Sequence, residues 1–277
     1  MDIDPRLGEL LALAPSDTGR IVVMTAAGIS AESGIPTFRG PEGYWRVGSV
    51  NYQPEQLATF AAFTAMPAAI WGWYLHRRGV CLSAVPNAAH RALVELEQAF
   101  GHRFLLVTQN VDGLHLRAGT SPERLYQVHG NLHHARCARG CSPPQALPAG
   151  LGIGWGKDRV PDDAATLALL HCGRCGGWLR PHVLWFDECY DEAHYHFDSA
   201  LAAIDEAALL LVVGTSGATN LPDQMVRRAC ARRVPLVVVN LDDSPFSVMA
   251  QQSPVGWFAQ GKATAFVPAI AAALIGH

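Results

Sequence analysis

The chain has 277 residues, of which 49% are hydrophobic and 16% are charged, and its formal net charge at pH 7 is −3. A chain of this length can bury a large core, and it lacks the clustered lysines and arginines of a nucleic-acid-binding surface. No apolar run is long enough to cross a bilayer, and the acidic N-terminus has neither the basic region nor the cleavage site of a signal peptide. We therefore expect a globular, cytoplasmic protein that binds neither nucleic acid nor membranes.

Leucines at positions 7, 10, 11 and 13 predict a short amphipathic helix near the N-terminus. Four short apolar runs then follow along the chain, and each ends in a cluster of small or polar residues. Helical patterns at 87–100 and 221–233 lie between them. Runs of this kind are typical of buried parallel strands, so the alternation predicts an α/β fold with a Rossmann-like, doubly wound parallel sheet. The predicted strands are Ile21–Met24, Phe104–Val107, Leu209–Val213 and Leu236–Val239.

Two stretches interrupt this alternation. Residues 41–86 are rich in aromatic side chains and helical in pattern, and residues 131–180 contain two cysteine pairs and a middle rich in glycine and proline. We interpret both as insertions that form a smaller lobe, a helical insertion and a zinc module. The Rossmann-like lobe is then built from residues 1–40, 87–130 and 181–277, and the whole chain forms one catalytic unit.

The first predicted strand is followed by Thr25-Ala26-Ala27-Gly28, which has almost no side-chain bulk. Small residues between a strand and a helix often allow a phosphate to approach the backbone. A tight turn without a ligand explains this stretch equally well. The stretch is neither G-x-G-x-x-G nor G-x-x-x-x-G-K-[ST], so neither standard nucleotide-binding motif applies.

Four of the seven cysteines form two close pairs, Cys137 with Cys141 and Cys172 with Cys175. Two such pairs suit a tetrahedral zinc site made of four thiolates, although free thiols or disulfides are the alternative. Four thiolates fill the coordination shell and leave no position for a water molecule. The expected zinc ion is therefore structural.

A polar cluster with Gln109, Asn110 and Asp112 follows the second predicted strand, and His129 follows shortly after it. A single histidine is more often structural than catalytic. Here an amide and carboxylate cluster precedes it and the cysteine pairs follow it, which favours a functional site.

The order of these segments resembles that of the sirtuins, the NAD-dependent protein deacylases. The resemblance covers residues 20–268 and rests on several motifs in sequence. These are AAGISAESGIPTFRG, TQNVDGLHLRAG, VHG, the two cysteine pairs, RPHVLWFDE, GTS and VVVNLD.

The resemblance implies a reaction in which an acyl-lysine carbonyl oxygen attacks the nicotinamide ribose of NAD, which yields nicotinamide and O-acyl-ADP-ribose. His129 is then the general base, for which an imidazole is suited by its near-neutral pKa. Asn110 and Asp112 hold the nicotinamide amide and organise the ribose. The substrates are proteins with acylated lysines.

The resemblance also implies which residues bind the cofactor and the substrate. The segment that contains Thr37, Phe38, Arg39 and Trp45 closes over NAD. The remaining cofactor residues are Ala26, Ala27, Gly28, Ile29, Ser30, Gln109, Gly214, Thr215, Ser216, Asn240, Asp242, Lys262 and Ala263. The substrate residues are Ala58, Tyr74, Arg77, Val183, Trp185 and Phe186, and the segment 182–186 offers a strand edge to the substrate peptide.

Three positions depart from the sirtuin pattern. Ala26 replaces a glycine in the first loop, and Asp187 replaces a glycine and places a carboxylate at the rim of the peptide cleft. The segment GTSGATNLP is one residue longer than usual and lacks the hydrophobic residue that sirtuins usually have before the proline on the strand opposing the peptide. The second and third departures affect peptide docking rather than NAD binding.

Tyr74 and Arg77 are three positions apart and share one face of a predicted helix. One interpretation is an arginine near a helix C-terminus, with Gly79 as the C-cap. The other follows from sirtuins of class III, in which a Tyr-x-x-Arg pair holds negatively charged acyl groups such as succinyl, and Ala58 matches the small residue that widens that pocket. We favour deacylation with a preference for acidic acyl groups. ADP-ribosyl transfer, NAD hydrolysis and a non-catalytic NAD or ADP-ribose sensor are the alternatives.

Overall fold

The structure, a computed structural model, describes residues 4–13, 18–36, 45–47 and 50–276. Its main element is a six-stranded parallel sheet with the strand order β11-β10-β9-β1-β4-β5. The strands are β1 (Arg20–Thr25), β4 (Phe104–Thr108), β5 (Leu125–Gln127), β9 (Ala207–Val213), β10 (Leu236–Asn240) and β11 (Gly256–Gln260).

The four strands predicted from apolar runs are confirmed as β1, β4, β9 and β10, which occupy the middle of the sheet. The two outer strands, β5 and β11, were not expected. Both are outer strands, with a neighbouring strand on one side only. Their sequences lack the continuous β-branched run that is typical of central parallel strands.

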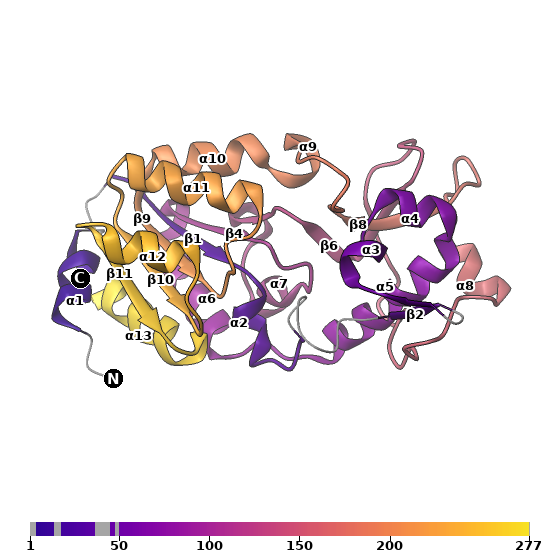
Figure 1. Ribbon diagram of the computed structural model, residues 1–277, viewed down its shortest axis with the longest axis horizontal. Coiled ribbons are helices and arrows are strands. Elements are labelled where there is room, and N and C mark those ends of the chain that lie inside the picture. Colours follow the sequence, from indigo (N-terminus) through magenta and orange to yellow (C-terminus); the bar gives the residue numbers. More distant parts are fainter. Residues whose placement is uncertain (1–3, 14–17, 37–44, 48–49, 277) are drawn as a thin grey trace.

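Side chains of the sheet alternate between two cores. Ile21 and Val23 of β1 belong to one hydrophobic cluster, whereas Val22 and Met24 belong to the other. Helices cover both faces, which confirms the doubly wound architecture (Figure 1). The first cluster includes residues of α1 (Pro5–Ala12), α6 (Ala88–Phe100) and α13 (Ala263–Gly276), and the second includes residues of α10 (Phe197–Asp205), α11 (Asn220–Ala231) and α12 (Pro245–Gln252).

Short helices connect these elements, and several follow a strand directly. Among the described residues, no helix has both the length and the apolar composition that crossing a bilayer requires. The short helices are α2 (Ala27–Ala31), α7 (Leu114–Ala118) and α9 (Glu192–Tyr195), with 3₁₀ turns at Gly101–Arg103 and Pro122–Arg124.

A second group of elements lies to one side of the parallel sheet (right in Figure 1). It has its own hydrophobic cluster, which includes the fully buried Trp71 and Trp185. The lobe boundaries that we expected from the sequence stay a prediction. The elements are β2 (Trp45–Val47), β3 (Val50–Tyr52), α3 (Pro54–Leu57), α4 (Phe60–Ala65), α5 (Pro67–Ser83), α8 (Ala164–Leu169) and the antiparallel sheet β7-β6-β8, with β7 (Gln145–Ala146), β6 (Gly130–Cys137) and β8 (Leu179–Val183).

Helix α5 packs closely against the loop that contains Gly152. A Cβ atom on Gly79 would lie 2.1 Å from the Gly152 carbonyl oxygen, so only glycine permits this approach. Next to it, the buried Arg78 guanidinium donates to the carbonyl of Pro148 at 3.0 Å. The helix continues to Ser83, so the interpretation of Gly79 as a C-cap is wrong. Gly79 serves packing, and Arg77 is not at a helix end.

Candidate functional site

The predicted cofactor residues gather at one edge of the parallel sheet, where its strands end. Residues 26–30 follow β1, residues 109–112 follow β4, and residues 214–216 follow β9. Asn240 ends β10, and Lys262 comes soon after β11. In open α/β sheets, ligands bind outside the carboxyl ends of the strands, so the sequence-predicted positions converge on the expected edge.

Gly28 and Gly214 bring two of these strand ends into direct contact. The Gly28 amide donates to the Gly214 carbonyl at 2.9 Å, and Gly214 has φ +66°. A Cβ atom on Gly28 would lie 2.5 Å from the Gly214 Cα atom, and one on Gly214 would lie 2.6 Å from Gly28. The sequence left two interpretations open for these small residues, room for a ligand or a tight turn. The structure shows that these two glycines are required first for backbone packing between β1 and β9.

A buried chain of hydrogen bonds joins Asn110, Ser30 and Asp112. The Asn110 side-chain amide donates to the Ala26 carbonyl and to Ser30 Oγ, both at 3.1 Å, and Ser30 Oγ donates to Asp112 Oδ2 at 2.7 Å. The other Asp112 oxygen accepts from the Leu114 amide at 2.8 Å. Burial raises the pKa of the Asp112 carboxyl, while these two hydrogen bonds oppose the rise. These hydrogen bonds hold the three side chains in place. The side-chain oxygen of Asn110 is the acceptor that the amide of a ligand could use.

His129 is held at both ring nitrogens. Its Nδ1 donates to the Gln109 carbonyl at 3.0 Å, and its Nε2 lies 2.7 Å from the hydroxyl oxygen of Tyr190. Because a carbonyl can only accept, the proton of the neutral ring is on Nδ1, and Nε2 accepts from the phenol. Burial lowers the pKa of His129 to about 4, so the ring is neutral near pH 7. A neutral imidazole with an acceptor at Nε2 is the form that a general base needs.

The Gln109 side chain connects this histidine to the end of β9. Its amide nitrogen donates to Thr215 Oγ1 at 3.2 Å, and its amide oxygen accepts from Thr219 Oγ1 at 2.9 Å. The Asn240 amide donates to the Thr215 carbonyl at 3.1 Å. Sequence reasoning missed Thr219 and Tyr190. No local motif identifies Tyr190, because its contact with His129 spans 61 residues of chain.

The remaining cofactor residues lie at the periphery or outside the described chain. Asp242 and Ser216 are exposed, and Ala263 is buried at the start of α13. The Lys262 ammonium lies 3.7 Å from a carboxylate oxygen of Glu32. Thr37, Phe38 and Arg39 lie outside the described residues, and of Trp45 only the backbone, at the start of β2, is described.

Of the predicted acyl-binding residues, Tyr74 contacts Trp185 directly. The Trp185 indole N–H donates to the Tyr74 hydroxyl at 2.7 Å, and both side chains are buried. Burial raises the pKa of Tyr74 to about 12, and the positive charge of Arg77 partly opposes this rise. The Arg77 guanidinium lies 5.2 Å from the centre of the Trp73 ring. Ala58 is buried in the same hydrophobic cluster.

The expected peptide-binding segment follows β8, which is an outer strand of its sheet. Val183 ends that strand and pairs with Gly130 of β6. Trp185 is 1% exposed, so its side chain lies in the interior rather than on the surface. Phe186 is 52% exposed, and its amide donates to the Ala58 carbonyl at 2.9 Å.

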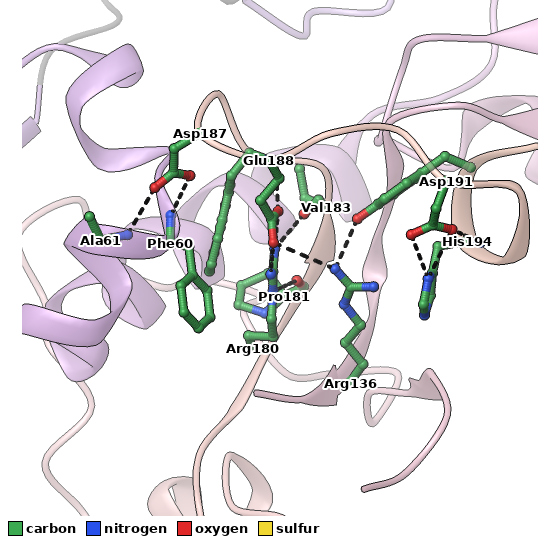
Figure 2. Close-up of polar contacts among 12 residues, drawn as sticks. Phe60, Ala61, Arg136, Arg180, Pro181, Val183, Asp187, Glu188, Asp191 and His194 are labelled. Carbon is green, nitrogen blue, oxygen red and sulfur yellow. Dashed lines mark hydrogen bonds and ion pairs between the residues drawn. The ribbon is translucent and has the colours of Figure 1, made fainter. Parts of the chain in front are cut away.

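Asp187 takes part in a contact that the sequence did not suggest. Its carboxylate accepts from the backbone amides of Phe60 at 2.7 Å and Ala61 at 3.1 Å, in the first turn of α4 (Figure 2). A carboxylate at the N-terminus of a helix satisfies otherwise unpaired amides. The Asp187 carboxylate therefore ties the segment after β8 to α4.

Glu188 anchors the same segment to the small sheet. It accepts hydrogen bonds from both terminal nitrogens of the buried Arg180, one of them at 2.8 Å, and from the Trp185 amide at 3.0 Å (Figure 2). The Arg180 guanidinium also lies 3.6 Å from the centre of the Trp185 ring. A second guanidinium, that of Arg136, lies 3.8 Å from Glu188. These contacts hold Trp185 against Tyr74.

The four paired cysteines form one cluster, with all four sulfur atoms within 4.8 Å of one another. Three measured separations are 3.6 Å for Cys137–Cys175, 3.3 Å for Cys137–Cys141 and 3.4 Å for Cys141–Cys172. In a tetrahedral site with Zn–S bonds of about 2.3 Å, neighbouring sulfurs are about 3.8 Å apart. The donor set and its size therefore fit a zinc ion.

A cavity of about 800 Å³ opens at the opposite edge of the sheet, among residues that include Arg20, Glu206 and Asp205. Its charged groups pair with one another, for example Arg20 with Glu206 at 2.9 Å and Arg232 with Asp205 at 3.5 Å. The cavity contains none of the predicted site residues. The residues at the carboxyl ends of the parallel strands therefore indicate the function better than this cavity does.

Comparisons with known proteins identify relatives of this chain. The model of the Sir2 family matches residues 26–220. An NAD-dependent protein deacylase of Leptospira interrogans is 39% identical over 249 residues, which cover 90% of each chain. The mitochondrial NAD-dependent protein deacylase sirtuin-5 of Canis lupus familiaris is 40% identical, over 81% of this chain and 74% of its own.

Solved structures give the same result. A Sir2 homologue in complex with NAD superimposes with a TM-score of 0.78 and 31% identity, over 99% of this chain and 94% of the other. A mutant Sir2 homologue in complex with ADP ribose has a TM-score of 0.77, also with 31% identity, over 98% and 96% of the two chains. The match of the family model to most of the chain, the identity to these relatives and the shared fold lead to one conclusion: the chain belongs to the Sir2 family.

Proposed function

We propose that the protein is an NAD-dependent protein-lysine deacylase with a preference for acyl groups that end in a carboxylate. Its substrates are proteins with acylated lysines, and its products are nicotinamide and O-acyl-ADP-ribose. Membership of the Sir2 family, in which relatives are named NAD-dependent protein deacylase, supports the reaction class. The arrangement of Tyr74, Arg77 and Trp185 supports the acyl preference.

The residues at the carboxyl edge suit NAD as the bound cofactor. Gln109, Thr215 and Asn240 supply amides and hydroxyls at the ends of β4, β9 and β10, which suits a ligand rich in hydroxyl groups. The buried Asn110 and Asp112 suit the carboxamide. When bound, NAD supplies an activated glycosidic carbon with nicotinamide as its leaving group.

His129 is the general base in this proposal. The Gln109 carbonyl keeps the proton of the neutral ring on Nδ1, so that Nε2 takes the proton of the reacting hydroxyl. The Ser30–Asp112 hydrogen bond keeps the neighbouring carboxylate in place while this transfer occurs. The four cysteines hold a structural zinc ion that has no part in proton transfer.

Two groups on α5 favour an acidic acyl chain. The Tyr74 oxygen accepts from Trp185, which leaves the phenol hydrogen as a donor to a ligand carboxylate. Arg77 lies one turn further along the helix, and its charge acts on Tyr74. An acyl carboxylate buried without a partner would cost several kcal/mol, and a guanidinium and a phenol together can offset that cost.

Nicotinamide release, measured with and without acyl-lysine peptides, tests the reaction class. Release that depends on the peptide supports deacylation. Release without peptide indicates NAD hydrolysis, and binding of NAD without any release indicates a sensor.

Replacing Arg77 by Met tests the acyl preference, because the change keeps much of the bulk and removes the charge. Desuccinylation should fall by roughly two to three orders of magnitude, as expected for the loss of a buried charge-assisted pair that contributes about 3–4 kcal/mol. Deacetylation should change far less, since an acetyl group is short and neutral. The measurement is kcat/KM for matched succinyl and acetyl peptides at saturating NAD.

The matched control is Arg91→Met, which removes an exposed guanidinium from α6. It should leave the ratio of the two catalytic efficiencies unchanged. If Arg77→Met reduces both activities equally, Arg77 supports the helix and the preference for acidic acyl groups is wrong.

A further inference from the structure

Tyr190 contacts the proposed base but has no role in the function described so far. It lies two residues after Glu188, on the segment that Asp187 and Glu188 tie to α4 and to β8. The chain is therefore fixed just before Tyr190, which helps to place the phenol next to His129. The ring centroids of Tyr190 and His129 are 5.8 Å apart, and the Tyr190 ring also packs against Phe197 at 5.8 Å.

The phenol occupies the reactive side of the imidazole. Nδ1 is committed to the Gln109 carbonyl, so Nε2 has the only lone pair with which the neutral ring can accept a proton. That lone pair accepts the Tyr190 hydroxyl hydrogen, with 2.7 Å between the heavy atoms. A substrate hydroxyl that approaches His129 therefore reaches the Tyr190 oxygen before it reaches Nε2.

The same hydroxyl lies beside the network at the cofactor edge. Thr219 partly opposes the rise that burial causes in the pKa of Tyr190, and Thr219 Oγ1 donates its hydrogen to the Gln109 side chain at 2.9 Å. Gln109 in turn donates to Thr215 at 3.2 Å. The phenol thus lies next to both the base and Thr219, which is bonded to the proposed cofactor residue Gln109.

We propose that Tyr190 is a further catalytic residue, through whose hydroxyl the proton removed from the substrate reaches Nε2 of His129. The inference rests on the proposed function, because it assumes that His129 acts as a base. In one concerted step, the substrate O–H bond breaks and a new O–H bond forms on Tyr190. The original Tyr190 O–H bond breaks as the Nε2–H bond forms.

The charges balance without a further reactant. Tyr190 is neutral before and after the transfer, His129 becomes a cation, and the substrate oxygen becomes the nucleophile. Burial lowers the pKa of His129 and raises that of Tyr190, so both groups start in the neutral forms that the relay needs. Burial causes the lowered pKa of His129, and the hydrogen bond to the Gln109 carbonyl partly opposes it.

The first experiment needs no activity. Nitrogen-15 NMR of the ligand-free protein should show Nδ1 of His129 protonated and Nε2 accepting a hydrogen bond, with His129→Gln used to assign the signals. In Tyr190→Phe, the Nε2 signal should move to the position of a nitrogen without that bond. The control Tyr126→Phe removes the hydroxyl of a tyrosine that stacks on His196 instead, and should leave the signal unchanged. An unchanged Nε2 signal in Tyr190→Phe would overturn the proposal.

The second experiment measures deacylation and NAD binding on the same variants. Tyr190→Phe should lower kcat by about 10- to 100-fold, less than the full effect of general acid–base catalysis (roughly 10²–10⁴-fold), because water can replace a hydroxyl in part. NAD affinity should be unchanged, and the dependence of the rate on the D₂O fraction should indicate two transferred protons in the wild type and fewer in the variant. Wild-type kcat in Tyr190→Phe, or a loss of NAD affinity equal to the loss of rate, would overturn the relay. A wild-type protein without any deacylation would instead refute the proposed function, while the NMR result would still report on the hydrogen bond.

Discussion

Replacing Glu188 by Gln should lower the free energy of unfolding by about 2–4 kcal/mol. The Arg180 side chain is only 3% exposed, and Glu188 is the carboxylate that accepts hydrogen bonds from both of its terminal nitrogens. Glutamine keeps the shape but removes the charge and turns one acceptor into a donor that faces a guanidinium.

The magnitude follows from the contacts that remain. Removing one partner of a buried ion pair typically costs about 3–5 kcal/mol. Here Arg180 keeps hydrogen bonds to the carbonyls of Val183 at 2.7 Å and Pro181 at 3.3 Å, and glutamine can still accept one bond, so the expected loss is smaller. At about 2–4 °C per kcal/mol for a chain of comparable size, the melting temperature should fall by roughly 4–16 °C.

Urea unfolding followed by circular dichroism measures this loss, with Asp223→Asn as the matched control. Asp223 forms an ion pair with Arg227 at 2.8 Å, in which the two side chains are 32% and 64% exposed. Exposed pairs typically contribute about 0.2–1 kcal/mol. If Glu188→Gln costs no more than Asp223→Asn, burial does not make the Glu188–Arg180 pair important, and the reasoning fails.

Two further predictions concern the metal and the pH. Metal analysis should find about one zinc ion per chain, and Cys172→Ser should lower the zinc content and the melting temperature together. The control Cys189→Ser, at an exposed thiol, should change neither. A stable, zinc-free Cys172→Ser protein would contradict the structural role of the zinc ion. Burial lowers the pKa values of His90 and His129 to about 4, so below about pH 6.5 the unfolded chain binds protons that the folded protein does not. Stability should therefore be fully present above about pH 6.5 and fall toward pH 4, by up to about 1.4 kcal/mol per pH unit for each histidine, and urea unfolding between about pH 7 and pH 5 should show this slope. Stability that is flat over this range would count against the buried, neutral state of both histidines.

Much of the fold could be predicted from local sequence patterns. A strand that is buried on both faces needs an unbroken apolar run, and β1, β4, β9 and β10 have one. The outer strands β5 and β11 have neighbours on one side only, so their sequences carry a weaker pattern and were missed. The end of α5 was also ambiguous, because Gly79 resembles a C-cap until the packing against Gly152 is known.

The amino-acid sequence by itself determined the sheet that places the polar clusters at one edge, and the paired cysteines that fit a zinc ion. Each strand and each cysteine pair is a local pattern of residues close together in the chain, and such patterns can be recognised without the tertiary structure. Only the tertiary structure decided that Tyr190 meets His129, that Asp187 binds the backbone of α4, and that Gly28 must be a glycine because Gly214 touches it. Such contacts join residues far apart in the sequence, and short-range patterns of propensity and periodicity contain no information on which distant side chains the folded chain brings within hydrogen-bond distance.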